Sequence, residues 1–394
     1  MQPTRHLPTV LAAALAVSLS ACDGAATAPA ATAPAAPAAA QGVDSEQGQA
    51  RLEVVASGLA HPWAVAPLPE GGFLVTERGG ALRRIGADGS VSGPLAGVPE
   101  VTARGQGGLL DVALAPDFAS SKRIYLTYAE PGEGNLSGTA AAYATLDGDS
   151  LRDLTVIYRQ APKVDAEHHY GSRLAFDGSG HVFISQGDRS FKPMAQALDK
   201  LQGKLVRLNL DGSVPQDNPF VGQDGARAEI WSYGHRNAQG LAFDPRTGTL
   251  WESEHGPRGG DELNLPRPGL NYGWPLITHG IDYSGKPIAE AVGREREGLE
   301  QPHHVFEVSP GLSGMAFHTG HAGKPWNDSL FLGALAQRNL IRLQLDGDRV
   351  VGEERLLQDL GERIRDVRAG NDGNIYVLTD EADGKLLRLQ PPQD

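Results

Sequence analysis

Cysteine is almost absent from this chain, since Cys22 is the only one among 394 residues. A single cysteine excludes a disulfide within the chain, so the folded part is stabilised by its apolar core, with or without a bound metal ion. The same count excludes a covalently attached c-type haem, because the CxxCH motif that holds it needs two cysteines.

The chain also lacks an excess of positive charge. Its 35 Lys and Arg residues against 48 Asp and Glu residues give a formal net charge of −13. An acidic surface repels the phosphate backbone of nucleic acids, so we expect no nucleic acid partner. Any site for an anionic ligand then has to be built locally from arginines that the fold brings together.

Long apolar runs are lacking as well, apart from residues 7–19, a run too short for a membrane-spanning helix. Arg5 precedes it, and the small-residue sequence LSAC follows it and ends at Cys22. This is the pattern of a bacterial lipoprotein signal. We therefore expect residues 1–21 to be a signal peptide, Cys22 to be acylated, and the protein to be lipid-anchored to a membrane on the periplasmic side. The alternative is an ordinary secretory signal in which Cys22 is incidental.

Residues 22–50 contain hardly any large apolar side chain and consist mainly of Ala, Pro, Thr and Gln. Such a segment buries too little surface to offset its chain entropy, so we expect a disordered tether. No second linker follows, and residues 51–394 are predicted to form one domain.

Aromatic residues make up only 6% of the chain and helix-period patterns are scarce, whereas glycine is abundant at 50 residues. Short alternating strands joined by glycine turns recur six times, at residues 71–85, 122–147, 180–190, 248–265, 329–347 and 373–390. Regular repetition in an all-β chain favours a propeller over a two-sheet sandwich. We predict an all-β fold, a six-bladed β-propeller with four-stranded antiparallel blades.

Apolar strings rich in alanine, such as LLDVAL and QGLAF, precede several of these repeats and are predicted to be the innermost strands. In a propeller the ends of the innermost strands converge on one axis, so residues near those ends should meet in a central funnel. Five groups lie at such positions: Gln106; His168 and His169; Arg236 and Asn237; Gly256 and Pro257; Arg363 and Arg365.

The two adjacent histidines, His168 and His169, offer a candidate general base. Neighbouring residues of a strand point to opposite faces, so only one of them would face a given site. A neutral imidazole within reach of a hydroxyl is a suitable base near neutral pH. The alternative is a histidine that only hydrogen-bonds a neighbouring loop.

Arg363 and Arg365 are two residues apart and would share one face of a strand. Two adjacent guanidinium groups need an anion between them. It would be either a carboxylated ligand or the nearby carboxylates of Asp366 and Glu362. Arg236 and Asn237 could hold the same ligand from another blade.

The Gly256-Pro257 corner is a candidate calcium site. Calcium prefers oxygen ligands, backbone carbonyls included, and Pro257 has no N–H to compete for them. Asp261, Glu262 and Asn271 lie close by in the same loop. The alternative is a plain turn.

Taken together, these motifs resemble those of the PQQ-dependent aldose sugar dehydrogenases, relatives of the soluble quinoprotein glucose dehydrogenases. The resemblance covers nearly all of residues 52–390. It rests on GQGGLLDVALAPDF, HHYGSRLAF, ISQGDR, YGHRNAQGLAFDP, EHGPRGGDELN, NYGWP and RIRDV. It implies a six-bladed propeller that uses PQQ and Ca²⁺ to oxidise an aldose to a lactone and passes the electrons to an external acceptor.

By this resemblance His169 is the catalytic base, and Arg236 stabilises the charge of the reduced quinone. Contacts to the cofactor would come from Gln106, Arg236, Asn237, Arg363 and Arg365. The carbonyls of Gly256 and Pro257 would hold the calcium ion beside PQQ, and Glu262 and Tyr272 would belong to a second, structural calcium site.

One position departs from the family pattern. Similar proteins carry a cofactor-contacting lysine after the GAL of the fifth repeat, where this chain has Ala336, with Arg338 as a possible replacement for the charge. Two other functions remain open at this stage, a calcium-dependent propeller hydrolase such as a lactonase and a non-catalytic binding propeller. The preferred sugar stays undetermined, and so does the choice between monomer and homodimer.

Overall fold

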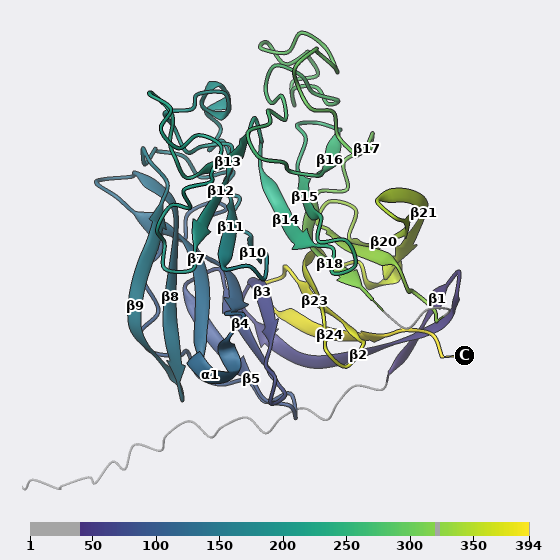
Figure 1. The fold of residues 1–394 in the computed structure, drawn as a ribbon. Helices are drawn as coiled ribbons and strands as arrows, with labels where there is room; N and C mark the ends of the chain where they lie inside the picture. Colours follow the sequence, from purple (N-terminus) through teal and green to yellow (C-terminus); the bar gives the residue numbers. More distant parts are fainter. Residues whose placement is uncertain (1–39, 320–323, 394) are drawn as a thin grey trace, which may run out of the picture. The chain divides into compact units, whose positions relative to one another are not determined.

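The computed structural model describes residues 40–319 and 324–393. In this part of the chain the regular structure is almost entirely β-strand, arranged in six antiparallel sheets (Figure 1). The only helical turns described are α1 (Phe118–Ser121) and the 3₁₀ turns η1 (Lys192–Ala195) and η2 (Gln358–Leu360). No helix of the described part is both long and apolar enough to cross a membrane. The predicted signal peptide, Cys22 and the tether up to residue 39 lie outside the described residues.

The sheets follow one another along the chain as the blades of a propeller, each numbered from its innermost strand outward. The first three blades are β3 (Pro62–Pro67), β4 (Phe73–Glu77), β5 (Ala81–Ile85); β6 (Leu109–Leu114), β7 (Arg123–Pro131), β8 (Ser137–Asp147), β9 (Ser150–Arg159); and β10 (Leu174–Phe176), β11 (His181–Ser185), β12 (Lys204–Asn209), β13 (Ile230–Tyr233).

The other three blades complete the ring. They are β14 (Ala238–Phe243), β15 (Leu250–Glu254), β16 (Asp261–Asn264), β17 (His304–Phe306); β18 (Leu312–His318), β19 (Ser329–Ala334), β20 (Asn339–Asp346), β21 (Arg349–Leu356); and β22 (Ile364–Ala369), β23 (Ile375–Thr379), β24 (Gly384–Gln390), β2 (Gly48–Leu59), β1 (Gln41–Ser45).

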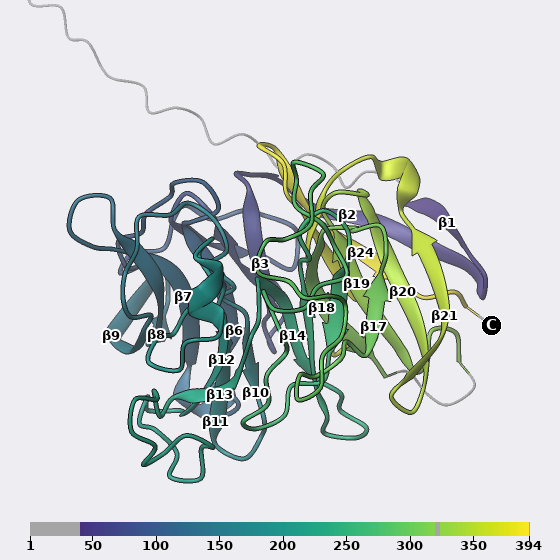
Figure 2. The same ribbon diagram turned by 90° about the horizontal axis from the view of Figure 1, so that it is seen from above.

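Each innermost strand contacts the innermost strand of the next blade, and β22 contacts β3, which closes the circle. Figure 2 shows β3, β6, β14 and β18 towards the middle of the ring and β1, β9 and β21 at its edge. The predicted six-bladed propeller is therefore confirmed, and all six sequence repeats fall in different blades. The blades are not uniform, because the first has three strands and the last has five.

The apolar core is divided among the interfaces between neighbouring blades. Six hydrophobic clusters each join side chains of two adjacent blades, and together they cover all six interfaces. Near the axis the strands come so close that small residues are required. A Cβ on Gly314 of β18 would lie 2.1 Å from Asp366 Oδ1 of the neighbouring β22.

An ion network of four side chains crosses the axis. Arg173 Nη1 lies 2.9 Å from Asp366 Oδ1 and 3.4 Å from Asp111 Oδ1, and Arg368 pairs with both carboxylates at 3.1 and 2.6 Å. The guanidinium of Arg173 also lies 4.1 Å from the centre of the Trp63 ring. Because Asp111, Arg173 and Asp366 are buried and belong to three blades, the network fixes how those blades meet.

The predicted boundary between tether and domain at residue 51 is wrong. Residues 41–45 form β1, and β2 begins at Gly48, so the last ten residues assigned to the tether belong to the propeller. Strand β2 pairs with β24, so the start of the chain completes the sheet that the end of the chain forms. The short, polar β1 gave no apolar alternation by which the sequence could have revealed it.

A chain that begins at His61, and so lacks β1 and β2, is expected to be less stable by about 3 kcal/mol or more. Leu52 and Leu59 are buried in the closing blade, and each loses about 1.5–3 kcal/mol of burial free energy. Urea unfolding measures the loss, with a chain beginning at Ala40 as the control. Equal unfolding midpoints for the two chains would mean that the closure contributes nothing.

Candidate functional site

A cavity of about 1090 Å³ opens among the loops around the propeller axis. Its walls include five of the predicted site residues, drawn from three blades: Gln106, Gly256, Pro257, Arg363 and Arg365. A second cavity of about 440 Å³ is lined by His168, His169 and Arg236, and it shares Gln106, Pro257 and Tyr283 with the first. Residues far apart in sequence therefore converge on two adjoining cavities, as the propeller arrangement requires.

His169 lies in the loop before β10, in the left-handed backbone conformation, with φ of 56°. Its backbone N–H donates to Gln106 Oε1 at 2.9 Å, and its Nδ1 lies 2.6 Å from Asp188 Oδ1. Asp188 is held in turn by Trp274 Nε1 and by the backbone N–H of Ser190, each at 2.7 Å. A left-handed non-glycine residue is a strained conformation that a functional site commonly retains.

Burial, together with the positive charge of Arg236, lowers the pKa of His169 from its ordinary value of about 6.5. The imidazole is therefore neutral at neutral pH. Burial alone would raise the pKa of Asp188, but the hydrogen bond with His169 keeps this pKa below its ordinary value. The Asp188 carboxylate is therefore ionised. An ionised acceptor at Nδ1 places the imidazole proton there and leaves Nε2 free to accept a proton.

The strand argument used for His168 and His169 does not hold. Both histidines lie in an irregular segment, not on a strand, and both line the second cavity with their rings 6.3 Å apart. Only His169 has the carboxylate partner, so the distinction between the two depends on Asp188 and not on strand alternation.

Arg236 lines the second cavity. Its Nη1 donates to the His255 carbonyl at 3.1 Å, its guanidinium lies 5.3 Å from the centre of the Trp274 ring, and its buried Nε has no hydrogen-bond partner among the described residues. Asn237 lines neither cavity. Its Oδ1 accepts the Gly171 N–H at 3.1 Å, so it holds the loop that follows His169.

Arg363 and Arg365 share one carboxylate, but it is neither of those suggested by their sequence neighbourhood. Asp380 Oδ2 lies 3.4 Å from Arg363 and 2.7 Å from Arg365. Against the effect of burial, these two arginines lower the pKa of Asp380 to about 2. Asp366 belongs to the axial ion network, and Glu362 pairs with Lys385. The two guanidinium groups therefore share one carboxylate, and both still line the large cavity.

Further cavity-lining residues were missed by the sequence reasoning. His61 and Arg78 line the large cavity from the first blade, and Arg258 lines it from the Gly-Pro loop. The Arg258 guanidinium forms no ion pair or hydrogen bond within the described part of the chain. His61 directly precedes an innermost strand, as the predicted residues do, and that position was the signal available for it.

The family's lysine position also faces this cavity. Ala336 lines it, whereas Arg338 does not, because the Arg338 Nη1 donates to the Gly361 carbonyl at 2.7 Å. Arg338 therefore does not replace the missing charge, whereas the Arg258 guanidinium lines the same cavity as Ala336.

The Gly256-Pro257 corner is shaped so that no side chain fits at its first position. A Cβ on Gly256 would lie 2.2 and 2.3 Å from the carbonyl oxygens of Gly260 and Gly259. Asp261 fixes the corner through the Gly256 N–H at 3.0 Å. Within the described residues neither the Gly256 nor the Pro257 carbonyl accepts a hydrogen bond, so both oxygens remain available to a cation.

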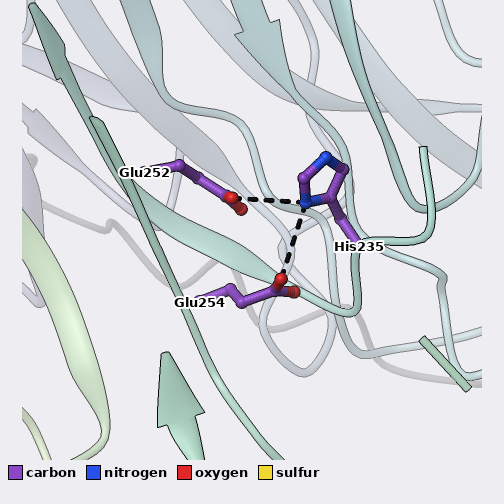
Figure 3. A group of neighbouring side chains, drawn as sticks. All are labelled: His235, Glu252 and Glu254. Carbon is purple, nitrogen blue, oxygen red and sulfur yellow. Dashed lines mark ion pairs between the residues drawn. The ribbon is translucent and has the colours of Figure 1, made fainter. Parts of the chain in front are cut away.

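Glu262 and Tyr272 lie away from both cavities. Burial and the nearby Glu254 carboxylate raise the pKa of Glu262 well above its ordinary value. Tyr272 stacks on the His235 ring at 4.8 Å. Both therefore adjoin a buried group formed by His235, Glu252 and Glu254 (Figure 3). The sequence analysis did not single out this group.

Fold and site together define a six-bladed β-propeller with a central cavity that four arginines help to line, beside a histidine–aspartate pair. The chain belongs to the glucose / sorbosone dehydrogenase family, whose sequence model matches residues 59–388. Aldose sugar dehydrogenase YliI of Escherichia coli (strain K12) is 52% identical over 343 residues, which cover 86% of this chain and 92% of that protein.

Solved structures agree with this assignment. A crystal structure of a glucose dehydrogenase is 59% identical, with a TM-score of 0.84 over 86% of this chain and 98% of that chain. The PQQ-bound form of an aldose sugar dehydrogenase from Streptomyces coelicolor is 30% identical, with a TM-score of 0.72 over 90% of this chain and 99% of that one.

Proposed function

We propose that this protein is a PQQ- and calcium-dependent aldose dehydrogenase that oxidises an aldose at its anomeric carbon to the lactone and passes the electrons to an external acceptor. The observation that carries the proposal is the position of neutral His169, hydrogen-bonded to ionised Asp188, beside a large cavity lined by Arg363, Arg365 and Arg258. The PQQ-bound relative and the family membership support it.

The residues present fit both groups that this function needs. PQQ is a tricarboxylate, and the large cavity offers it the guanidinium groups of Arg258, Arg363 and Arg365. Calcium prefers oxygen ligands, and the Gly256 and Pro257 carbonyls are free beside the same cavity. We expect Gln106, Arg363, Arg365 and Arg258 to hold the cofactor and Gly256 and Pro257 to hold the calcium ion. A direct contact from Asn237 remains a prediction.

We expect the sugar to react in the second cavity, where His169 and Arg236 lie. The bound quinone supplies the hydride acceptor for the anomeric carbon. His169 Nε2 takes the proton of the anomeric hydroxyl, so that the C–H electron pair leaves as hydride and the C–O bond becomes a carbonyl. Asp188 keeps the imidazole in the required tautomer and stabilises the imidazolium that forms. Arg236, which lines the same cavity, would stabilise the negative charge of the reduced quinone.

Reconstitution tests this function. The purified protein, given PQQ and Ca²⁺, is expected to reduce an artificial electron-accepting dye when an aldose is added. Removing Ca²⁺ with a chelator before PQQ is added is expected to abolish turnover. The control is the same protein with Ca²⁺ but without PQQ. Dye reduction no faster than this control with every aldose tried would refute the proposal.

We also propose that the protein is a lipoprotein anchored through Cys22 on the periplasmic side of a membrane, on the strength of the sequence pattern at residues 1–22. Cys22→Ser is expected to move the protein from the membrane fraction to the soluble fraction of fractionated cells. Wild-type protein found only in the soluble fraction would contradict the anchor.

A further inference from the structure

Arg189 is a buried cation that lines neither cavity. It is 0% exposed and directly follows Asp188 in the chain. Among the described residues, the hydrogen bonds of its guanidinium go to backbone carbonyls and to a hydroxyl, and none of them goes to a carboxylate. Arginine is almost never fully buried unless it is paired. A buried ion pair therefore does not explain why this position holds an arginine.

The acceptors of this guanidinium connect the loop that carries His169 to the start of β8. Arg189 Nε donates to the His168 carbonyl at 2.9 Å, and Nη2 donates to the Ala166 carbonyl at 2.5 Å. Nη1 donates to the Ser137 carbonyl at 3.0 Å, and Nη2 lies 3.2 Å from Ser137 Oγ. Because a guanidinium is a rigid planar fork, this one side chain fixes the loop against the strand.

Tyr170, on the other side of His169 in the chain, also contacts this arginine. The Arg189 guanidinium lies 3.6 Å from the centre of the Tyr170 ring, and the Tyr170 hydroxyl lies 2.9 Å from Ser137 Oγ. Burial lowers the pKa of Arg189 to about 10, which leaves the group charged at neutral pH. Hydrogen bonds from a charged donor are stronger than those between neutral groups. Arg189 therefore holds the chain on both sides of His169.

Three consecutive residues fix His169 in different ways. Asp188 Oδ1 lies 2.6 Å from His169 Nδ1 and fixes the imidazole, whereas Arg189 fixes the backbone that precedes it. His169 has a φ of 56°, a conformation that a non-glycine residue retains only where its surroundings impose it. Gly187 packs against the same backbone, because a Cβ there would lie 2.0 Å from the His169 carbonyl oxygen. The segment 187–189 therefore holds His169 by both its side chain and its main chain.

We propose that Arg189 is a positioning residue for the sugar oxidation, which holds the His169 imidazole in the place that proton transfer requires. This rests on the proposed role of His169 as the base. Arg189 lines neither cavity, so it acts on the sugar only through His169. A misplacement of about 1 Å can lower the rate about 10²-fold. A looser loop should therefore lower kcat without removing any contact to the sugar or to the cofactor.

Arg189→Lys tests this role, because lysine keeps the charge but lacks the planar fork and cannot hold all these carbonyls together. We expect it to lower kcat of the reconstituted enzyme by about 10–10²-fold, with KM for the aldose and the affinity for PQQ unchanged. In a His169→Gln background the same change should have no further effect on the residual kcat, because the residue through which Arg189 acts is already lost.

A second measurement needs no turnover. The pKa of His169 is measured by NMR titration of its imidazole in protein free of PQQ, with the signal identified by its absence in His169→Gln. Three groups act on this pKa: the Asp188 hydrogen bond and charge raise it, and Arg236 and His168 lower it. A looser loop weakens the Asp188 bond, so Arg189→Lys should lower the pKa. This result does not depend on dehydrogenase activity, so it separates failure of the positioning from failure of the proposed function.

Arg342→Lys is the matched control, because Arg342 is also a buried arginine, 2% exposed, and lines neither cavity. Its kcat should equal that of the wild type. If Arg189→Lys does not fold, Ser137→Ala removes one acceptor of the arginine and should lower kcat in the same direction, again only when His169 is present. Equal kcat for Arg189→Lys and wild type, the same fold loss in both backgrounds, or an unchanged His169 pKa would each overturn the proposal.

Discussion

Replacing His169 by glutamine is expected to lower kcat of the reconstituted enzyme by about 10²–10⁴-fold, the range typical for the loss of a general base. Glutamine keeps the size of the side chain and can still donate to Asp188, but it cannot accept the anomeric proton. Steady-state rates of dye reduction with saturating aldose measure the effect. PQQ affinity, measured separately by the absorbance change on binding, should be preserved.

His181→Gln on β11 is the matched control, because it removes an imidazole that is hydrogen-bonded to a carboxylate, that of Asp177, at the same distance of 2.6 Å but lies outside both cavities. Its kcat should equal that of the wild type. A His169→Gln enzyme with an unchanged kcat would assign the base to another residue of the second cavity.

The pH dependence follows from the direction of the His169 pKa. Since burial and Arg236 lower this pKa, the base is neutral throughout the neutral range. We expect kcat/KM to rise with pH through a pKa below about 6.5 and to stay level above it. The hydrogen bond and charge of Asp188 raise the pKa of His169, so Asp188→Asn should shift this limb to lower pH in addition to lowering the rate.

The second large effect concerns stability. Arg173→Met is expected to lower the free energy of unfolding by about 3–5 kcal/mol, the usual cost of breaking a buried ion pair. Without Arg173, Arg368 is the one basic side chain of the described residues that still pairs with the buried carboxylates of Asp111 and Asp366. Urea unfolding followed by tryptophan fluorescence measures the change.

Arg349→Met is the matched control, because Arg349 also loses an ion pair, that with Asp346 at 2.6 Å, but both side chains are exposed. Arg349→Met should therefore lower the free energy of unfolding by no more than about 1 kcal/mol. Similar losses for the two variants would mean that the axial network does not hold the blades together.

The repeats predicted the six blades well, because glycine turns and alternating strands are local features. The closing strands were not predicted. Strand β2 is stabilised by pairing with β24, more than 300 residues later, and nothing within residues 41–50 signals that partner. The unequal strand numbers of the first and last blades were not predicted for the same reason. Whether a segment near the end of the chain adds a strand to a sheet depends on which edge strand of that sheet is unpaired, and only the folded structure determines this.

In the candidate site the residue types were predictable but their partners were not. His169, Arg363 and Arg365 stood out by their neighbours in sequence, whereas Asp188 and Asp380, which determine what these residues can do, come from other segments. The suggestion that Arg338 supplies the missing lysine's charge failed for a related reason, because its backbone position turns it toward Gly361 and away from the cavity.

The sequence by itself determined the repeating β architecture, the positions of the polar groups near the inner strand ends and the family resemblance, because each depends on residues that are neighbours along the chain. Only the tertiary structure decided which carboxylate pairs with which cation, which side chains line the two cavities, and that Glu252 and Glu254 lie within 3.5 Å of His235 Nδ1. Those features depend on distances through space between segments of different blades, and such distances are fixed only when the ring closes.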